Sequence, residues 1–135
     1  MTPGDVPLFI YGTLKRGHRR HGLLGGSRLF RPLVYAPGYT LVDAGGYPGM
    51  VEAESPGQFV EGEIFLIGPE TLARLDDYEN LASGEYQRLP VCVFDDRGSA
   101  HRAHAYLYRW PVENLPLINK RWTTDRESTS PLRHP

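Results

Sequence analysis

Glycine and proline divide this chain into short segments, and this feature constrains its fold more than any other. There are 15 glycines and 12 prolines among 135 residues, well above the ~12% that the two types together make up in an average protein. Glycine is conformationally free and proline lacks a backbone N–H donor, so both interrupt regular structure. A bundle of long helices is therefore disfavoured, and one small domain with many turns is expected.

Apolar patterning between these interruptions predicts mainly strands. Residues 7–11 form a continuous apolar run, which is typical of a strand covered on both faces. Residues 45–49, Gly-Gly-Tyr-Pro-Gly, are expected to form a loop. Further strands are expected over two pieces of residues 28–42 that are broken at Pro32 and at Pro37-Gly38, over residues 58–67, and over residues 86–96 and 101–110, which a turn at residues 95–98 joins.

One segment, residues 69–79, has helical periodicity. Pro69 suits the first position of a helix, and four residues recur on one face: Leu72, Leu75, Tyr78 and Glu79. Arg74, Asp76 and Asp77 lie off this face and can be solvated. Six or seven strands with one clear helix predict an α+β domain over residues 1–122, built on a small mixed β-barrel or strongly curved sheet. Residues 123–135 contain one aliphatic residue and are expected to be a disordered tail.

The charge and the apolar runs of the chain argue against several classes of protein. Fifteen basic and 16 acidic residues give a net charge of −1, which favours neither a nucleic-acid nor a membrane partner. No apolar run reaches the ~18 residues of a spanning helix, and no basic segment at the N-terminus indicates a signal peptide. A single cysteine, Cys92, fits a reducing cytoplasmic location. Its apolar neighbours predict a small buried hydrophobic residue rather than a nucleophile.

Glu79 is the most unusual residue of the expected helix. It shares a face with Leu72 and Leu75, which should turn toward the core. A carboxylate there is either solvated at the frayed helix end or held in a pocket, where burial would raise its pKa and make it usable as an acid or base near neutral pH. Spacing alone favours the solvated alternative, because charged residues are mostly exposed.

A second candidate lies at the end of the first apolar strand, in the motif Tyr11-Gly12-Thr13-Leu14. A strand that stops at Gly-Thr leaves successive backbone N–H groups without ladder partners, and such groups can hold a carboxylate or an oxyanion. Glycine also permits close approach of a ligand to the backbone. Many strands end in Gly-Thr for ordinary turn reasons, so the motif alone is weak evidence.

Other polar groups are weaker candidates. Glu61 and Glu63 share a strand face and could form a paired-carboxylate site, although two exposed glutamates are the more ordinary interpretation. The basic run from Lys15 to His21 could hold phosphate or RNA, but a solvated loop is favoured because no RNA-binding motif accompanies it. His101 and His104 would point to opposite faces of a strand, and His18 with His21 lacks a third ligand, so no metal site is expected.

Several short motifs occur in an order known from one family. They are Tyr11–Gly17 (Tyr-Gly-Thr-Leu-Lys-Arg-Gly), Tyr47-Pro48-Gly49, Val60–Phe65 (Val-Glu-Gly-Glu-Ile-Phe), Leu75–Glu79 (Leu-Asp-Asp-Tyr-Glu) and Tyr86-Gln87-Arg88. With them, roughly residues 7–110 resemble the γ-glutamylcyclotransferase-like family, which includes the γ-glutamylamine cyclotransferases and the AIG2-like plant proteins. The resemblance implies a small mixed β-barrel with packed helices. It also favours a pocket rather than solvent for Glu79.

The resemblance further implies an enzyme that needs no metal or cofactor. The α-amine of a γ-glutamyl amine or peptide would attack the γ-carbonyl, releasing 5-oxoproline and a free amine, with Glu79 as general base and then general acid. Substrate would be bound by the backbone of Gly12, Thr13 and Leu14 and by the side chains of Tyr11, Tyr47 and Tyr86. A monomer or weak homodimer with a small-molecule substrate is expected, without nucleic-acid or membrane partners. The alternative is a non-catalytic protein of the same fold that binds a small carboxylate. Asn80, where relatives often have glycine, leaves the leaving amine open.

Overall fold

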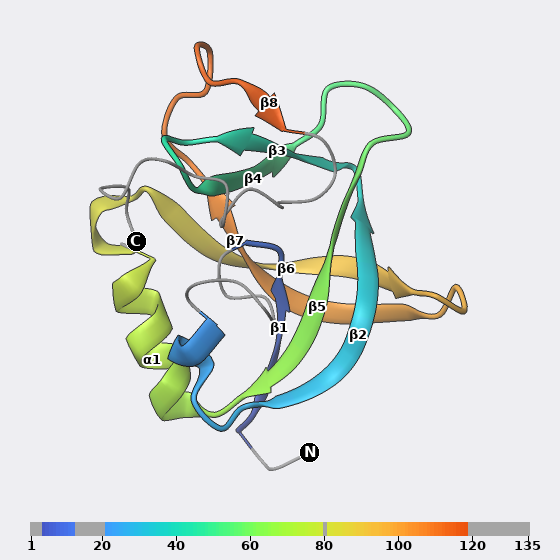
Figure 1. Ribbon diagram of the computed structural model, residues 1–135, viewed down its shortest axis with the longest axis vertical. Coiled ribbons are helices and arrows are strands. Elements are labelled where there is room, and N and C mark those ends of the chain that lie inside the picture. Colours follow the sequence, from blue (N-terminus) through green and yellow to red (C-terminus); the bar gives the residue numbers. More distant parts are fainter. Residues whose placement is uncertain (1–3, 13–20, 80, 119–135) are drawn as a thin grey trace.

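Eight strands and one α-helix make up most of the computed structural model, which describes residues 4–12, 21–79 and 81–118 (Figure 1). This confirms the predicted α+β barrel class. The elements are β1 (Val6–Ile10), η1 (His21–Leu24), β2 (Arg28–Pro37), β3 (Tyr39–Asp43), β4 (Pro48–Glu52), β5 (Phe59–Ile67), α1 (Pro69–Tyr78), η2 (Leu81–Ser83), β6 (Tyr86–Asp95), β7 (Ala100–Tyr108) and β8 (Leu117–Ile118). Here η denotes a 3-10 helix.

The sheet closes on itself through five of its strands. The strand order is β1-β5-β2-β6-β7-β4-β3-β8, and β1 also pairs with β7 in parallel at Leu8 and His104. The first five strands of this order therefore form a ring, and β4, β3 and β8 extend it beyond β7. Figure 1 shows these three strands together at one end of the molecule, with α1 against the outside of the barrel. Closure leaves few unpaired strand edges.

Strand β1 is covered on both faces, as its continuous apolar run predicts. Phe9 packs in the barrel interior, whereas Leu8 and Ile10 pack in a second cluster with α1. All three side chains are buried. Because successive side chains of a strand point to opposite faces, a strand between two apolar clusters needs an unbroken apolar sequence.

Helix α1 lies over this second cluster and agrees with the predicted segment 69–79. Gly68 is the N-cap and Pro69 takes the first helical position, where its missing N–H costs nothing. Leu72 and Leu75 are the buried residues of the helix. The helix ends at Tyr78, and the next residue, Glu79, is its C-cap. The capping position places the Glu79 backbone at the point where the chain turns toward β6.

The expected strand break at Pro32 is wrong, whereas the break at Pro37-Gly38 is confirmed. Strand β2 runs from Arg28 to Pro37, and its pairing with β5 shifts register around Arg31 and again before Val34. Proline is tolerated at such irregularities because its missing N–H is not required by a regular ladder. At the second site Gly38 has a φ of 88°, a conformation that suits glycine.

Two strands lie where the sequence predicts none. The expected loop 45–49 is a loop only as far as Tyr47, because β4 begins at Pro48 and pairs with β3. The two-residue strand β8 pairs with Leu41 and Val42 of β3, so this part of residues 111–122 packs on the chain's own sheet. The predicted tail, residues 123–135, lies outside the described residues. Among the described helices, none has the length and apolar character to cross a membrane.

Candidate active site

Tyrosine hydroxyls and carboxyl groups gather where the end of α1 meets β1, β6 and β7. The hydroxyl of Tyr11 donates to the carbonyl of Tyr106 at 2.5 Å, and that of Tyr106 donates to Asp76 Oδ1 of α1 at 2.7 Å. The hydroxyl of Tyr86 donates to the carbonyl of Pro48 at 2.7 Å. The first two contacts link α1, β7 and the residue that follows β1, and the third links β6 to the start of β4. We call this set of groups the polar cluster.

Glu79 belongs to this cluster and is not a fully solvated helix end. The residue is half-buried, and its backbone N–H donates to the carbonyl of Leu75 at 2.8 Å. Burial, and to a smaller extent the nearby Glu85 and Asp76 carboxylates, raise the pKa of its carboxyl to about 8. A carboxyl group with such a pKa can both accept and return a proton near neutral pH.

Tyr11 and Gly12, the first two residues of the Tyr-Gly-Thr-Leu motif, also lie in this part of the structure. Tyr11 is buried, and its hydroxyl also accepts the N–H of Met50 at 3.3 Å. Burial, and then the charge of Glu79, raise the pKa of Tyr11, so its hydroxyl stays protonated. A Cβ on Gly12 would lie 2.7 Å from the ring of Pro48, so only glycine fits without displacing the start of β4. Thr13 and Leu14 lie outside the described residues, as does Asn80.

Tyr47 and Tyr86 complete the set of predicted residues that the structure brings together. Tyr47 lies just before β4, and its hydroxyl donates to Glu85 Oε2. Burial raises the pKa of Tyr86, with smaller contributions from Tyr11, Glu79, Glu85 and Tyr47. Tyr86 therefore lies in the electrostatic field of the other four groups, which originate in four separate parts of the chain.

Asp76, Arg88 and Tyr106 contribute to the cluster although the sequence analysis does not assign them to the site. Asp76, which lies off the apolar face of α1 and could be solvated, is half-buried. Arg88 Nε and Nη2 donate to its two oxygens at 2.9 and 3.1 Å, and Tyr106 adds the third contact. This two-point contact attaches α1 to β6 one helical turn before Glu79. The Tyr-x-Arg motif of residues 86–88 is the sequence signal that could have revealed it.

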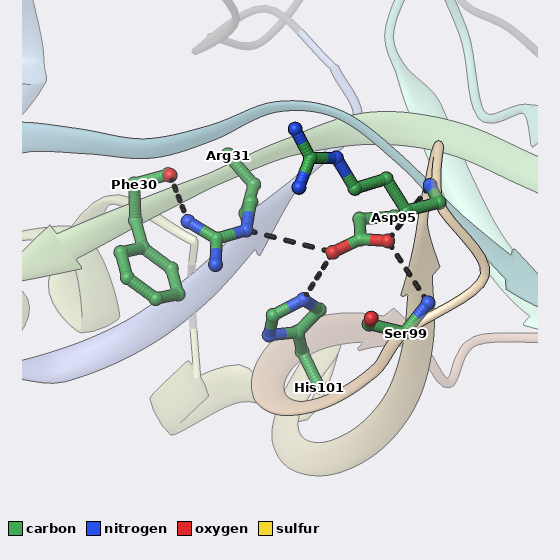
Figure 2. Close-up of polar contacts among 6 residues, drawn as sticks. Phe30, Arg31, Asp95, Ser99 and His101 are labelled. Atoms are coloured by element: carbon green, nitrogen blue, oxygen red, sulfur yellow. Dashed lines mark hydrogen bonds and ion pairs between the residues drawn. The ribbon is translucent and has the colours of Figure 1, made fainter.

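A second polar cluster lies at the far end of the β6–β7 hairpin, and Figure 2 shows it around Asp95. One carboxylate oxygen accepts the backbone N–H groups of Arg97 and Ser99, at 3.0 and 2.9 Å. The other lies 2.8 Å from His101 Nε2 and 3.6 Å from Arg31 Nε (Figure 2). The turn thus contacts one oxygen, and β7 and β2 contact the other, which gives this cluster a structural role.

The remaining candidates are scattered. Glu63 is buried, against the expectation of exposure, and Glu61 is half-buried. His101 contacts Asp95, whereas His104 contacts Arg88 at 3.2 Å. Over residues 4–12, 21–79 and 81–118, no group of three or more His, Cys, Asp or Glu residues could hold a metal ion. The basic run lies in residues 13–20, outside the described residues, apart from His21.

Several known proteins are similar to this chain in sequence or in structure. A human γ-glutamylaminecyclotransferase is 38% identical over 100 residues, 67% of this chain and 64% of the relative. The γ-L-glutamyl-butirosin B γ-glutamyl cyclotransferase of Niallia circulans is 33% identical over 106 residues, 75% of this chain and 65% of the relative. Both alignments span just under two thirds of the relative's length. The crystal structure of a mouse AIG2-like protein matches with a TM-score of 0.74 and 26% identity, covering 97% of this chain and 95% of that one.

The family assignment rests on more than these pairwise similarities. Residues 8–124 match the family described as "Gamma-glutamyl cyclotransferase, AIG2-like". The match includes β1 from Leu8 onward, the helix that Glu79 caps and the strand that follows it, so it covers all the residues of the polar cluster. The chain belongs to the γ-glutamyl cyclotransferase, AIG2-like family.

Proposed function

We propose that the protein is a γ-glutamyl cyclotransferase that releases 5-oxoproline and a free amine from a γ-glutamyl amine or peptide. The observation that carries this proposal is the desolvated carboxyl of Glu79, whose pKa is raised to about 8, among tyrosine hydroxyls at the end of α1. Strongly perturbed carboxyl groups concentrate at functional sites. The family relationship supplies the type of reaction.

The reaction requires a proton to leave one nitrogen and reach another. The α-amine of the substrate attacks the γ-carbonyl carbon, so a carbon–nitrogen bond forms and closes a five-membered ring. Glu79 accepts the proton that the attacking nitrogen loses. When the bond to the leaving nitrogen breaks, the protonated Glu79 returns that proton to it. Each step balances without an oxidant or an external nucleophile, and one carboxyl group suffices for both transfers.

Other residues of the cluster would bind and orient the substrate. Folding it so that the amine lies against its own γ-carbonyl supplies much of the rate gain, because the ring closure is intramolecular. We assign Tyr11, Tyr47 and Tyr86 to the walls and hydrogen bonds of this site. The backbone N–H groups of Gly12, Thr13 and Leu14 would hold the α-carboxylate or the developing oxyanion.

The leaving amine is the open part of the proposal. The human relative is named for γ-glutamylamines and the Niallia circulans relative for γ-glutamyl-butirosin B, so the family accepts different amines. A panel of γ-glutamyl-ε-lysine, γ-glutamyl amino acids, γ-glutamyl alkylamines and glutathione would establish which amine this chain releases. Release of 5-oxoproline is the readout common to all of them.

Glu79→Gln tests the assigned role of this carboxyl. The amide keeps the shape of the side chain but cannot accept a proton, so turnover should fall by at least ~10². Glu70→Gln is the matched control, because it makes the same change on an exposed residue of the first turn of α1 and should retain turnover.

Two outcomes would contradict the proposal in different ways. Near-full activity of folded Glu79→Gln would remove this residue from the mechanism. Absence of 5-oxoproline from every substrate with the folded wild-type protein would favour a non-catalytic protein of the same fold. In that case a rise in melting temperature with a small carboxylate would identify its ligand.

A further inference from the structure

Tyr106 belongs to the polar cluster, yet the proposed mechanism gives it no role. Its hydroxyl donates to Asp76 Oδ1 of α1 at 2.7 Å, and its backbone carbonyl accepts the hydroxyl proton of Tyr11 at 2.5 Å. Tyr11 directly follows β1. One residue of β7 thus contacts both the helix that leads to Glu79 and a tyrosine that we assign to the substrate-binding wall.

The alternation of β7 explains why the Tyr106 side chain faces the helix. Ala105 and Leu107 lie in the apolar cluster inside the barrel, whereas Tyr106 lies in the cluster that includes α1. The residue is buried. A phenylalanine ring would fill this apolar space equally well, so packing does not account for the hydroxyl group. A buried hydroxyl is costly without a hydrogen bond, and here it donates to a carboxylate of the helix.

Arg88 and Tyr106 contact the same carboxylate from neighbouring strands. They lie directly opposite each other in the pairing of β6 with β7, so both side chains extend from one face of the sheet. Arg88 contacts both oxygens of Asp76, and Tyr106 contacts the oxygen that also accepts from Arg88 Nε. An arginine side chain has many rotatable bonds, whereas a tyrosine ring has two. The phenol therefore defines the distance between α1 and β7 more narrowly than the guanidinium does.

The helix side of this contact lies next to Glu79. Asp76 precedes Glu79 by three residues, a spacing that brings side chains together on one side of a helix. The backbone N–H of Glu79 donates to the carbonyl of Leu75 at 2.8 Å, so Glu79 remains bonded to the last turn of α1. A movement of Asp76 relative to the barrel would therefore also move Glu79.

We propose that Tyr106 is a positioning residue of the reaction, which fixes the end of α1 against the barrel so that Glu79 is held in place relative to Tyr11. The inference rests on the proposed function, in which Glu79 moves the proton and Tyr11 borders the substrate. Proton transfer requires the carboxyl group within hydrogen-bond reach of the substrate nitrogen, and a small misplacement lowers the rate strongly. Tyr106 acts through Asp76 and Tyr11 rather than on the substrate.

Tyr106→Phe tests this role, because it removes the hydroxyl but leaves the ring and the backbone carbonyl. Amide hydrogen exchange of Glu79, with no substrate present, measures how firmly the helix end is held. We expect its rate to rise about tenfold, as the loss of one hydrogen bond allows. The N–H of Leu72, which donates to the Gly68 carbonyl at 2.9 Å in the first turn, should keep its wild-type rate. A uniform loss of stability would instead accelerate both amides.

Turnover supplies the second readout. In a wild-type protein that releases 5-oxoproline, kcat of Tyr106→Phe should fall about five- to tenfold with KM unchanged, because the barrel residues that bind substrate stay in place. A merely structural role would lower the melting temperature and leave kcat of the folded protein unchanged. Tyr35→Phe is the matched control on β2, where the ring lies 5.7 Å from Phe59 and 6.5 Å from Phe94. It should change neither readout.

Asp76→Ala removes the same contact from the helix side and serves as the test if Tyr106→Phe does not fold. Its effect on the exchange of Glu79 should exceed that of Arg88→Ala, which leaves the contact between Tyr106 and Asp76 in place. An Asp76→Ala effect no larger than that of Arg88→Ala would mean that the arginine alone holds the helix end, contrary to the inference.

The outcomes separate the two proposals. Wild-type exchange at Glu79 in folded Tyr106→Phe, or equal acceleration at Glu79 and Leu72, overturns the inference about Tyr106. Faster exchange at Glu79 with wild-type kcat overturns it too, because the hydroxyl would then hold the helix without serving the reaction. Faster exchange at Glu79 alone, in a protein whose wild type releases no 5-oxoproline, supports the positioning of the helix end and overturns the proposed function.

Discussion

Gly12 lies where the chain leaves β1, and the ring of Pro48 occupies the space that a side chain would need. A Cβ there would lie 2.7 Å from Pro48 Cγ and 3.4 Å from Cδ. Pro48 follows Tyr47, and its carbonyl accepts the hydroxyl proton of Tyr86. One methyl group at residue 12 would therefore displace two proposed substrate-binding tyrosines.

We expect Gly12→Ala to lower the free energy of unfolding by ~1–3 kcal/mol, the usual cost of an overpacked site, and to reduce 5-oxoproline release. Denaturant unfolding and the turnover assay measure the two effects. Gly22→Ala is the control, because a Cβ at Gly22 meets nothing within 4 Å. Equal stability and turnover in the two variants would show that the start of β4 yields freely to residue 12.

The pattern of residues along an element predicts which face a side chain lies on better than it predicts which residues that side chain contacts. The spacing alone does not determine whether the Glu79 carboxyl is solvated or buried, because either is possible at a helix end. Only the tertiary surroundings decide it. Cys92 was expected to be buried but is exposed, since the alternation of β6 turns Val91 and Val93 inward. Asp76 lies off the apolar face of α1 as predicted, yet Arg88 of β6 reaches it across the helix–barrel contact.

At the scale of elements, the position of Glu79 depends on how α1 attaches to the barrel. Leu72 and Leu75 supply the apolar contact, and the contact of Arg88 with Asp76 supplies the directional one. Both side chains of this pair are about a quarter exposed, so their attraction is only partly screened. The planar guanidinium fits both carboxylate oxygens, which an ammonium group cannot do.

Arg88→Lys should therefore keep the charge but lose the two-point contact. We expect a fall of ~1 kcal/mol in the free energy of unfolding and a larger relative loss in kcat than in substrate affinity, because the substrate-binding strands are unchanged. Arg74→Lys is the control on an exposed arginine of α1. Wild-type kcat in Arg88→Lys would show that the apolar contacts alone position the end of the helix.

A strand or helix is predictable when its own residues favour that structure. It is not predictable when pairing with a neighbouring strand determines it. Segments 58–67, 69–79, 86–96 and 101–110 all match elements of the structure within a few residues. Strand β4 is different, because proline and glycine at its start are typical of a loop. Gly49 is required there by a neighbour, since a Cβ would lie 2.7 Å from the Tyr108 side chain.

At the scale of the whole molecule, two apolar clusters share the strands of one barrel. One lies inside the barrel, and the other lies between the barrel and α1. Strand β7 contributes Leu107 to the first and Tyr106 and Tyr108 to the second. The proposed active site thus borders the outer cluster, where tyrosines add hydroxyl groups to an apolar setting. Neither the closure of the ring nor this division is visible in any single segment of the sequence.

The buried carboxyl of Glu79 and the paired carboxylate of Asp95 give the molecule opposite pH dependences. Glu79 has a pKa of about 8 in the folded state against an ordinary 4.5, so the folded state binds its proton more tightly. Folding is then favoured below pH 4.5, and this contribution is lost as the pH rises through about 8. The hydrogen bond from His101, with those from the backbone N–H groups of Ser99 and Arg97, lowers the pKa of Asp95 to about 2 from an ordinary 3.8. That contribution is present above pH 3.8 and is lost as the pH falls toward 2.

Stability should consequently be greatest on the acid side of neutrality, near pH 5 rather than pH 8. The Glu79 contribution corresponds to at most ~5 kcal/mol between its two pKa values. Burial lowers the pKa of His104. This opposes the decline only below the ordinary histidine pKa of 6.5, and to a smaller extent.

Thermal unfolding from pH 3 to 9 measures the profile. Glu79→Gln should flatten the decline from pH 5 to 8 and exceed the wild type in melting temperature at pH 8.5, whereas Asp95→Asn should flatten only the acid limb. A wild-type profile that rises steadily to pH 8 would mean that Glu79 is ionised in the folded protein at little cost, and a weakly basic Glu79 could not serve the proton transfer proposed for it.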